Sequence, residues 1–232
     1  MARTQEIARL RALIADIPGW LTDEEGEALY DLASRCTGRG VIVEIGSWKG
    51  KSTTCLGLGS RAGGNVRIYA VDPHADYRFG EFKANIERAG IADLVTPIPS
   101  LSQAAAPDFH EPVELLFVDG SHEYDDVKAD FDQWVPKLVE GGVLAVHDTT
   151  LWDGPKRVVE EHVYRSTQFK DVRFVFGSTT VATKVAQNTR GDRIRARYSL
   201  ALKRSFELAY RARKLIPQPA SRAARRILRA IR

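Results

Sequence analysis

The sequence has few cysteines and no long apolar run. Its 232 residues contain only Cys36 and Cys55, which lack the spacing of a metal motif. This favours reduced structural thiols over a disulfide framework. No apolar run approaches the ~20 residues of a transmembrane helix, and the first residues lack the apolar core of a signal peptide. We therefore expect a cytoplasmic protein with one sizeable domain.

Acidic residues are almost absent from the C-terminal part of the chain. Residues 190–232 carry 14 Lys/Arg against two acids, whereas the first 189 residues carry 20 against 28. An acidic body and a basic tail have different physical properties. With the hydrophobic pattern, this predicts three parts. They are an N-terminal helical lead-in over 1–37, a domain over 38–187 and a basic amphipathic helical tail over 188–232.

Strands and helices alternate through the middle of the chain. We predict strands over 41–45, 66–71, 94–98, 114–118 and 142–146, and helices near 51–61, 78–89, 124–138 and 156–165. Residues 172–184 are typical of a hairpin that turns at Gly177-Ser178. The fold class is therefore α/β: a Rossmann-like, doubly wound sheet, mostly parallel, with a C-terminal antiparallel hairpin and helices on both faces.

The most informative segment runs from Glu44 to Ser52, where a buried strand enters a turn with glycines at 46 and 50. A strand, a glycine turn and a helix N-terminus together are typical of a site for a nucleotide-like cofactor. Glu44 favours a ligand with a positive charge, such as the amino acid end of S-adenosylmethionine. The alternative is a P-loop-like nucleotide-binding protein or kinase that uses Lys51 and Ser52. The spacing between the glycines is one residue too short for that motif.

Acids and histidines follow the other strands. Asp72 stands where an acid commonly accepts hydrogen bonds from the ribose of an adenosine cofactor. Asp119 and Asp148 end two strands that we expect to be neighbours, so their carboxylates should face one cleft. A divalent cation such as Mg²⁺ would relieve their repulsion. His122 and His147 are candidate bases for a departing proton.

These segments together resemble the class I S-adenosylmethionine-dependent methyltransferases, and in particular the small O-methyltransferase group that acts on sugar hydroxyls. The matching stretches are 44–52, 71–74, 116–124 and 141–148, and the similarity spans about residues 15–185. The resemblance implies S-adenosylmethionine as cofactor and methyl transfer to a hydroxyl of a sugar, glycan or glycolipid. A divalent metal, a histidine base or both would assist the transfer.

The resemblance also implies roles for individual residues. Glu44, Gly46, Ser47 and Ser52 would surround the methionine end of the cofactor, Asp72 would hold the ribose, and Ser102 would lie near the adenine. The implied metal ligands are Asp119, His147 and Asp148, and Asp119 also borders the cofactor. The implied catalytic residues are His147, His122 and Asp119. His147 fills a slot that often holds an acid or amide in related enzymes, so a base without a metal is the alternative.

The basic tail has three interpretations. Ile194, Tyr198, Ala201, Leu208 and Leu215 fall near one helix face, and 220–231 repeats such a pattern. The tail could be a solvated or dimer-forming helix, or it could place the enzyme on the inner face of the membrane as a peripheral protein. Nucleic-acid binding is the least favoured interpretation, because no recognised motif accompanies the charge. A non-catalytic tethering protein with the same fold is a further alternative for the whole chain.

Overall fold

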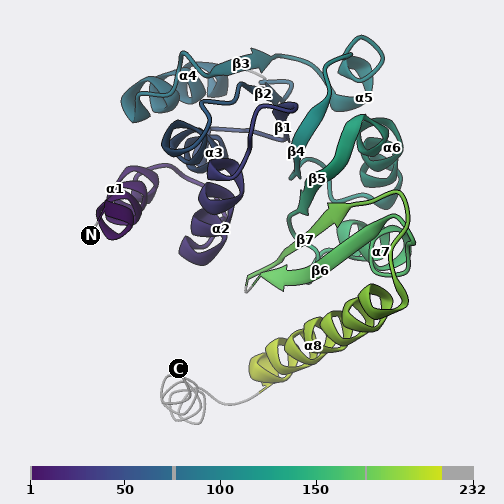
Figure 1. Cartoon of the computed structure of the whole chain (residues 1–232). Helices are drawn as coiled ribbons and strands as arrows, with labels where there is room; N and C mark the ends of the chain where they lie inside the picture. Colours follow the sequence, from purple (N-terminus) through teal and green to yellow (C-terminus); the bar gives the residue numbers. More distant parts are fainter. Residues whose placement is uncertain (1, 75–76, 176, 216–232) are drawn as a thin grey trace.

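The computed structural model describes residues 2–74, 77–175 and 177–215, and its centre is one seven-stranded sheet (Figure 1). The strand order is β3-β2-β1-β4-β5-β7-β6. The first five strands pair in parallel, and β7 pairs antiparallel with both β5 and β6. The strands are β1 Val41–Ile45, β2 Ile68–Val71, β3 Val95–Ile98, β4 Val113–Val118, β5 Leu138–Val146, β6 Phe169–Val175 and β7 Thr179–Lys184.

The predicted α/β class and the C-terminal hairpin are confirmed, and β4 and β5 are neighbours as expected. The helices are α1 Ala2–Ala15, α2 Asp23–Ser34, α3 Lys51–Ala62, α4 Arg78–Ala89, α5 Ser102–Ala105, α6 Tyr124–Trp134, α7 Asp153–His162 and α8 Arg190–Leu215. None of these described helices has the length and apolarity needed to cross a bilayer.

Two predicted boundaries around residue 138 are wrong. The helix predicted to run to 138 ends at Trp134 and is followed by a 3₁₀ turn over Val135–Lys137. Pro136 lacks the backbone N–H that the next hydrogen bond of the α-helix needs, so the helix gives way to the 3₁₀ turn there. Strand β5 then begins at Leu138, before the predicted 142. It passes through Gly141, whose φ of 78° only glycine adopts readily.

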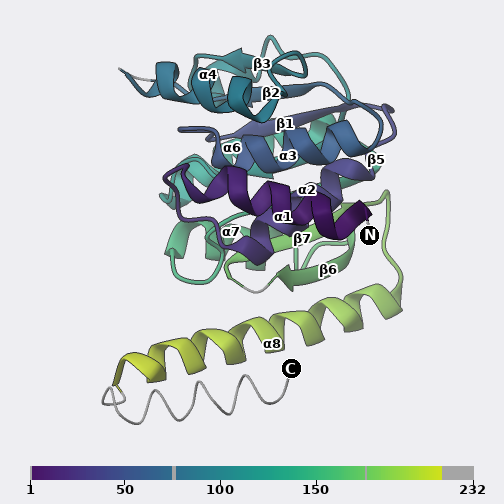
Figure 2. The ribbon, with the colours of Figure 1, turned by 90° about the vertical axis from the view of Figure 1, so that its left-hand side faces the viewer.

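Helices cover both faces of the sheet, and each face has its own core. Helices α1 to α4 lie on one face, which Figure 2 shows from the front, and α5 to α7 lie on the other. Side chains alternate along a strand, so Ile42 joins the first core while Val43 and Ile45 join the second. The same alternation directs Glu44 to the side of α3. Because α1 and α2 share the first core with the sheet, the predicted division at residue 37 stays a prediction.

Candidate active site

A cavity of about 850 Å³ opens where the parallel strands end. Its walls come from the segments that follow β1, β2, β4 and β5, and from residues 18–21 between α1 and α2. Ligands of open α/β sheets bind at this edge. The predicted residues Gly46, Ser47, Ser52, Asp72, Ser102, Asp119, His122, His147 and Asp148 all line it.

The turn after β1 has an unusual backbone. Gly46 and Gly50 both have a φ of 84°, and Trp48 between them has a φ of 41°. Positive φ strains a residue as bulky as tryptophan. Strain of this kind gathers at binding sites, where the surroundings enforce it. The Trp48 N–H donates a hydrogen bond to Asp72 Oδ2 at 2.9 Å, which ties the turn to the end of β2.

Replacing Gly46 with alanine should lower the free energy of unfolding by about 2–3 kcal/mol, since backbone strain and a steric clash add. A Cβ at Gly46 would meet the Asp119 carbonyl oxygen at 2.1 Å. Gly38 is a matched control, because its φ is also 84° but a Cβ there meets nothing within 4 Å. Urea unfolding of Gly46→Ala and Gly38→Ala measures the difference. Equal losses would mean that the close approach of the turn to Asp119 carries no cost.

Glu44 lies beneath the turn rather than on the cavity wall. Its side chain is fully buried, and the hydroxyls of Ser52 and Thr53 donate hydrogen bonds to its two carboxyl oxygens. Burial raises the pKa of Glu44 to about 8, although these two hydrogen bonds oppose the shift. Ser52 therefore stands between Glu44 and the cavity, and any effect of Glu44 on a ligand passes through this hydroxyl.

Asp72 shapes the turn as well as lining the cavity. Its Oδ1 accepts a hydrogen bond from the His74 N–H at 2.8 Å, while Oδ2 accepts the one from Trp48. The His74 ring lies against Phe79 and Phe82, and its Nε2 is 3.3 Å from Ser47 Oγ. The carboxylate is thus fixed by backbone donors before a ligand arrives.

Ser102 reaches the cavity from the start of α5 and donates a hydrogen bond to Asp130 of α6. Gln103 donates to the same Asp130 oxygen at 2.9 Å. Burial raises the pKa of Asp130 to about 6, against the effect of the Ser102 hydrogen bond. The sequence offered no signal for Asp130, which lies within a helix of several acids.

His147 stands at the centre of three carboxylates. Its Nδ1 is 3.0 Å from Asp119 Oδ1 and 3.5 Å from Asp148 Oδ2, and its Nε2 is 3.5 Å from Glu25 Oε1. Burial alone would lower the pKa of His147, but these three partners raise it to about 12. The surrounding carboxylates therefore favour the charged form of the imidazole.

Glu25 is the site residue that the sequence did not reveal. Its place at the third position of α2, in a capping box with Thr22, could be predicted. Its carboxylate also accepts hydrogen bonds from the Ser178 N–H at 2.6 Å and the Thr179 hydroxyl at 2.9 Å. Burial raises the pKa of Glu25, but the His147 interaction and the backbone N–H groups of Thr22 and Ser178 lower it to about 2.

His122 and Asp148 form a second pair on the cavity wall. His122 Nε2 lies 2.9 Å from Asp148 Oδ2, and the His122 ring stacks on Trp152 with centroids 4.2 Å apart. Asp148 has a φ of 57°, which an aspartate tolerates better than most residues. Burial raises the pKa of Asp148, but the contacts with His147 and His122 lower it overall.

One group of side chains in the described part of the chain could share a cation. Each of Asp119, His122 and Asp148 offers one oxygen or nitrogen atom, and these atoms all lie within 4.8 Å of one another. This set has His122 where the sequence predicted His147. Burial raises the pKa of Asp119, and the neighbouring Asp148 adds to the shift, although the contact with His147 opposes it. Two carboxylates and an imidazole suit a divalent cation, and the surplus of negative charge would favour one.

The cavity mouth carries exposed aromatic rings. Trp20 and Trp48 line the cavity and stack on each other with centroids 5.3 Å apart, and Trp20 is exposed. Trp152 and Tyr77 are exposed outside the lining, and Trp152 stacks on His122 of the cavity wall. Phe79 instead packs beside His74 and Phe82. Flat exposed rings next to polar groups suit an acceptor with an apolar face and several hydroxyls.

Comparison with known proteins agrees with this geometry. Residues 43–149, which span β1 through the loop after β5, match the family model Methyltransf_24, whose description is methyltransferase domain. This segment is therefore similar to methyltransferase domains. The matched segment includes the cavity residues from Gly46 to Asp148. A nucleotide-binding kinase that uses Lys51 and Ser52 is accordingly not favoured.

Solved structures share the fold of this chain over most of its length. The structure is similar to a Corynebacterium glutamicum protein (TM-score 0.62, 21% identity, 80% of this chain and 92% of that one). It is similar to the O-methyltransferase TomG of Streptomyces achromogenes with bound S-adenosylmethionine (0.59, 19%, 78% and 90%). It also resembles a Bacillus cereus O-methyltransferase with S-adenosylhomocysteine (0.57, 17%, 78% and 91%).

A curated relative covers only a short segment. An uncharacterised protein of Sinorhizobium fredii, y4gI, is 60% identical over 39 residues, which is 17% of this chain and 4% of that protein. The solved structures are all below 25% identity, so they show the Rossmann-like methyltransferase fold and not the acceptor.

Proposed function

We propose that this protein transfers the methyl group of S-adenosylmethionine to a hydroxyl oxygen of a sugar, a glycan or a glycolipid. The observation that carries this proposal is the shared cavity, in which the turn after β1 and Asp72 face the acids and histidines that follow β4 and β5. The first group suits the cofactor and the second suits deprotonation of a hydroxyl. The exposed ring of Trp20 borders this space, and Trp152 stacks behind His122.

The reaction needs an oxygen nucleophile that is aligned and deprotonated. The S-adenosylmethionine sulfonium supplies an electrophilic methyl group when it is bound. His122 faces the cavity with Nε2 directed to Asp148, so Nδ1 is the nitrogen that takes the acceptor proton. Asp148 orients this ring and stabilises the charge that it gains. Trp152 fixes the plane of the ring by stacking.

In this proposal His147 acts as a charged group beside the carboxylates, as an alternative to the predicted roles of base and metal ligand. It neutralises part of the charge of Asp119, Asp148 and Glu25 and holds the first two at the cavity wall. A divalent cation held by Asp119, His122 and Asp148 would supply Lewis-acid activation of the hydroxyl. Binding of the cation would occupy the His122 ring nitrogen, so base catalysis by His122 and metal activation are competing versions of the proposal.

Titration calorimetry with S-adenosylmethionine and with ATP-Mg²⁺, followed by transfer of a labelled methyl group to a panel of mono- and oligosaccharides, tests the proposal. We expect binding of S-adenosylmethionine and labelled product with at least one hydroxylated acceptor. Activity that is unchanged by EDTA would favour the histidine version, and activity lost with EDTA and restored by Mg²⁺ would favour the metal version. Binding of ATP without S-adenosylmethionine would refute the proposal.

Replacing His122 with glutamine should lower the turnover number by about 10²-fold, because glutamine cannot take up the acceptor proton. Affinity for S-adenosylmethionine should stay within a few-fold of the wild type. The exposed His110 lies away from the cavity, so His110→Gln is the matched control. Rates measured over pH separate the roles. A mutant that keeps the wild-type rate and pH profile would remove His122 from the mechanism.

A further inference from the structure

Helix α8 packs on the body through its charged side. Its buried positions include Asp192, Ala196, Lys203 and Glu207, which recur at helical spacing. Lys203 Nζ lies 2.6 Å from Glu207 Oε1, and Lys156 of α7 lies 2.7 Å from Glu207 Oε2. Arg204 pairs with Glu160 of α7 at 2.6 Å. Ion pairs and the Phe174–Phe206 contact with β6 thus anchor the helix.

The opposite side of α8 is apolar and exposed. Ile194, Tyr198, Leu202 and Leu208 have exposed fractions of 59%, 67%, 52% and 69%. Their spacing places them on the face that points away from the body. Ile194, Tyr198, Ala201 and Leu208 of the predicted apolar face are thus exposed to solvent. The side chain of Leu215 and the second predicted face over 220–231 lie outside the described residues. Between the four large residues lie the exposed small residues Ala201, Ser205, Ala209 and Ala212. We call these eight residues the outer face of α8.

Charge on the exposed part of α8 has one sign. Both acids of the helix, Asp192 and Glu207, are buried on the inner side. Arg193, Arg197, Arg204 and Arg211 are exposed and follow one border of the outer face, at intervals that keep them on one line. Residues 216–232 add five arginines and no acid to the sequence. An apolar face with a basic border is therefore the surface that α8 presents to its surroundings.

We propose that the outer face of α8 docks on an anionic lipid bilayer, with its apolar residues at the level of the acyl chains and its arginines on the lipid phosphates. Helices with one apolar face and a basic border bind membrane surfaces in this way. Charge complementarity decides against a second copy, because an antiparallel pairing of two outer faces brings the two arginine borders together. Nucleic acid would use the arginines but leave Ile194, Leu202 and Leu208 without a partner.

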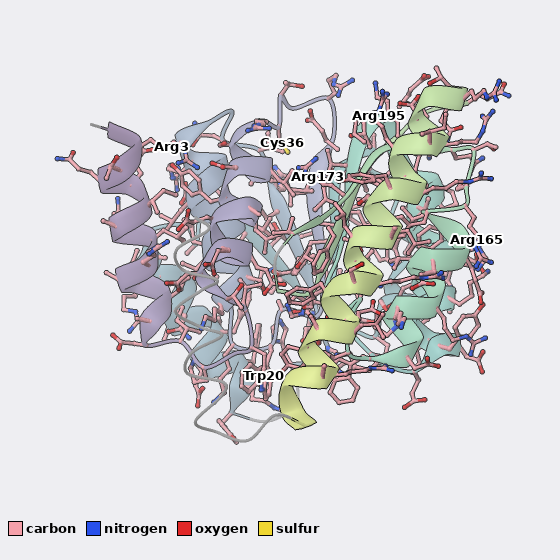
Figure 3. The ribbon with its side chains drawn as sticks, turned by 90° about the horizontal axis from the view of Figure 1, so that it is seen from below. Arg3, Trp20, Cys36, Arg165, Arg173 and Arg195 are labelled. Atoms are coloured by element: carbon pink, nitrogen blue, oxygen red, sulfur yellow. The ribbon has the colours of Figure 1, made fainter. Side chains whose placement is uncertain are left out.

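The C-terminal end of α8 lies at the same end of the molecule as the cavity. The C-terminal half of the helix reaches α7 through Glu207 and Lys156, and α7 begins directly after Trp152, which stacks on His122 of the cavity wall. Figures 2 and 3 both show the C-terminal end of α8 at one end of the molecule, and Figure 3 labels Trp20 at the same end. The C-terminal end of α8 and Trp20 of the cavity wall thus lie at the same end of the molecule.

Flotation of the full-length protein with vesicles tests the docking. The probes are vesicles of phosphatidylcholine alone and of phosphatidylcholine mixed with phosphatidylglycerol. We expect flotation with the anionic vesicles only. The variant I194Q/L202Q/L208Q changes three exposed positions to a good helix former, so helicity by circular dichroism should be preserved. Its partition coefficient should fall roughly 100-fold, whereas the matched control I194L/L202M/L208M should bind as the wild type does.

A second variant tests the arginine border. Arg197→Gln with Arg211→Gln should weaken binding to phosphatidylglycerol vesicles roughly 25-fold, and added salt should weaken the wild type in the same direction. Failure of the wild type to float would overturn the proposal, as would full binding by the triple glutamine variant. A wild-type dimer in solution that the triple variant converts to a monomer, without flotation, would assign the outer face to a second copy. A gel shift with nucleic acid without flotation would assign it to that partner.

Discussion

Replacing Asp119 with asparagine should lower the turnover number by about 10³-fold while affinity for S-adenosylmethionine stays within a few-fold. Asp119 lines the cavity and touches His147, and it belongs to the only group in the described part of the chain whose ligand atoms lie close enough for a shared cation. Asparagine keeps the shape of the side chain but removes its charge. The loss should therefore appear in the chemical step and not in folding.

Asp126 provides the matched control for Asp119. It also lines the cavity, but its carboxylate accepts a hydrogen bond from Ser121 and lies outside the group around His147. Single-turnover rates and calorimetry on Asp119→Asn and Asp126→Asn separate chemistry from binding. Equal losses of rate and affinity in Asp119→Asn would make Asp119 a cofactor-binding residue only. Full activity would remove it from the site altogether.

Replacing His147 with alanine should lower the free energy of unfolding at neutral pH by about 4 kcal/mol, because removal of one partner from a buried ion pair leaves the other uncompensated. Glu25 and His147 are both almost fully buried, and no other cation contacts Glu25 among the described residues. The exposed His110 is the control, and His110→Ala should change stability by less than about 0.5 kcal/mol.

The raised pKa of His147 predicts how its contribution to the free energy of unfolding changes with pH. The pKa of His147 is raised to about 12 by its carboxylate partners, above the value near 6.5 of an unfolded histidine. Its contribution is fully present below pH ~6.5 and decreases as the pH rises toward 12. The wild-type advantage over His147→Ala in urea unfolding should therefore shrink between pH 7 and 10. An advantage that grows with pH would show that the imidazole is neutral in the folded protein.

The sequence predicted the sheet and most of the cavity because both depend on local patterns. Apolar strands alternating with helices specify a parallel sheet, and the carboxyl ends of such strands meet at one edge. Asp72, Asp119 and Asp148 could therefore be placed together before any coordinates existed. Glu44 could not be placed so well, because only the alternation along β1 and the position of α3 reveal that it faces Ser52 and Thr53.

The sequence did not predict the roles of residues whose contacts lie in distant segments of the chain. Glu25 contacts the turn between β6 and β7, which is more than 150 residues away, and no pattern in either segment points to the other. The state of His147 follows from this contact, so the sequence left its role as a base open. The outward direction of the apolar residues of α8 was equally hidden, since helical spacing shows that residues share a face but not what the face contacts.

The contact between Glu25 and Ser178 determines when the surroundings of His147 can form during translation. The two residues are separated by 153 positions. A nascent chain therefore carries Gly46, Asp72, Asp119 and His147 outside the ribosome before the hairpin that completes their surroundings has emerged. Contacts between such distant segments form late in folding. The surroundings of His147 are therefore complete only when Glu25 and the hairpin have met, after nearly the whole domain has been translated.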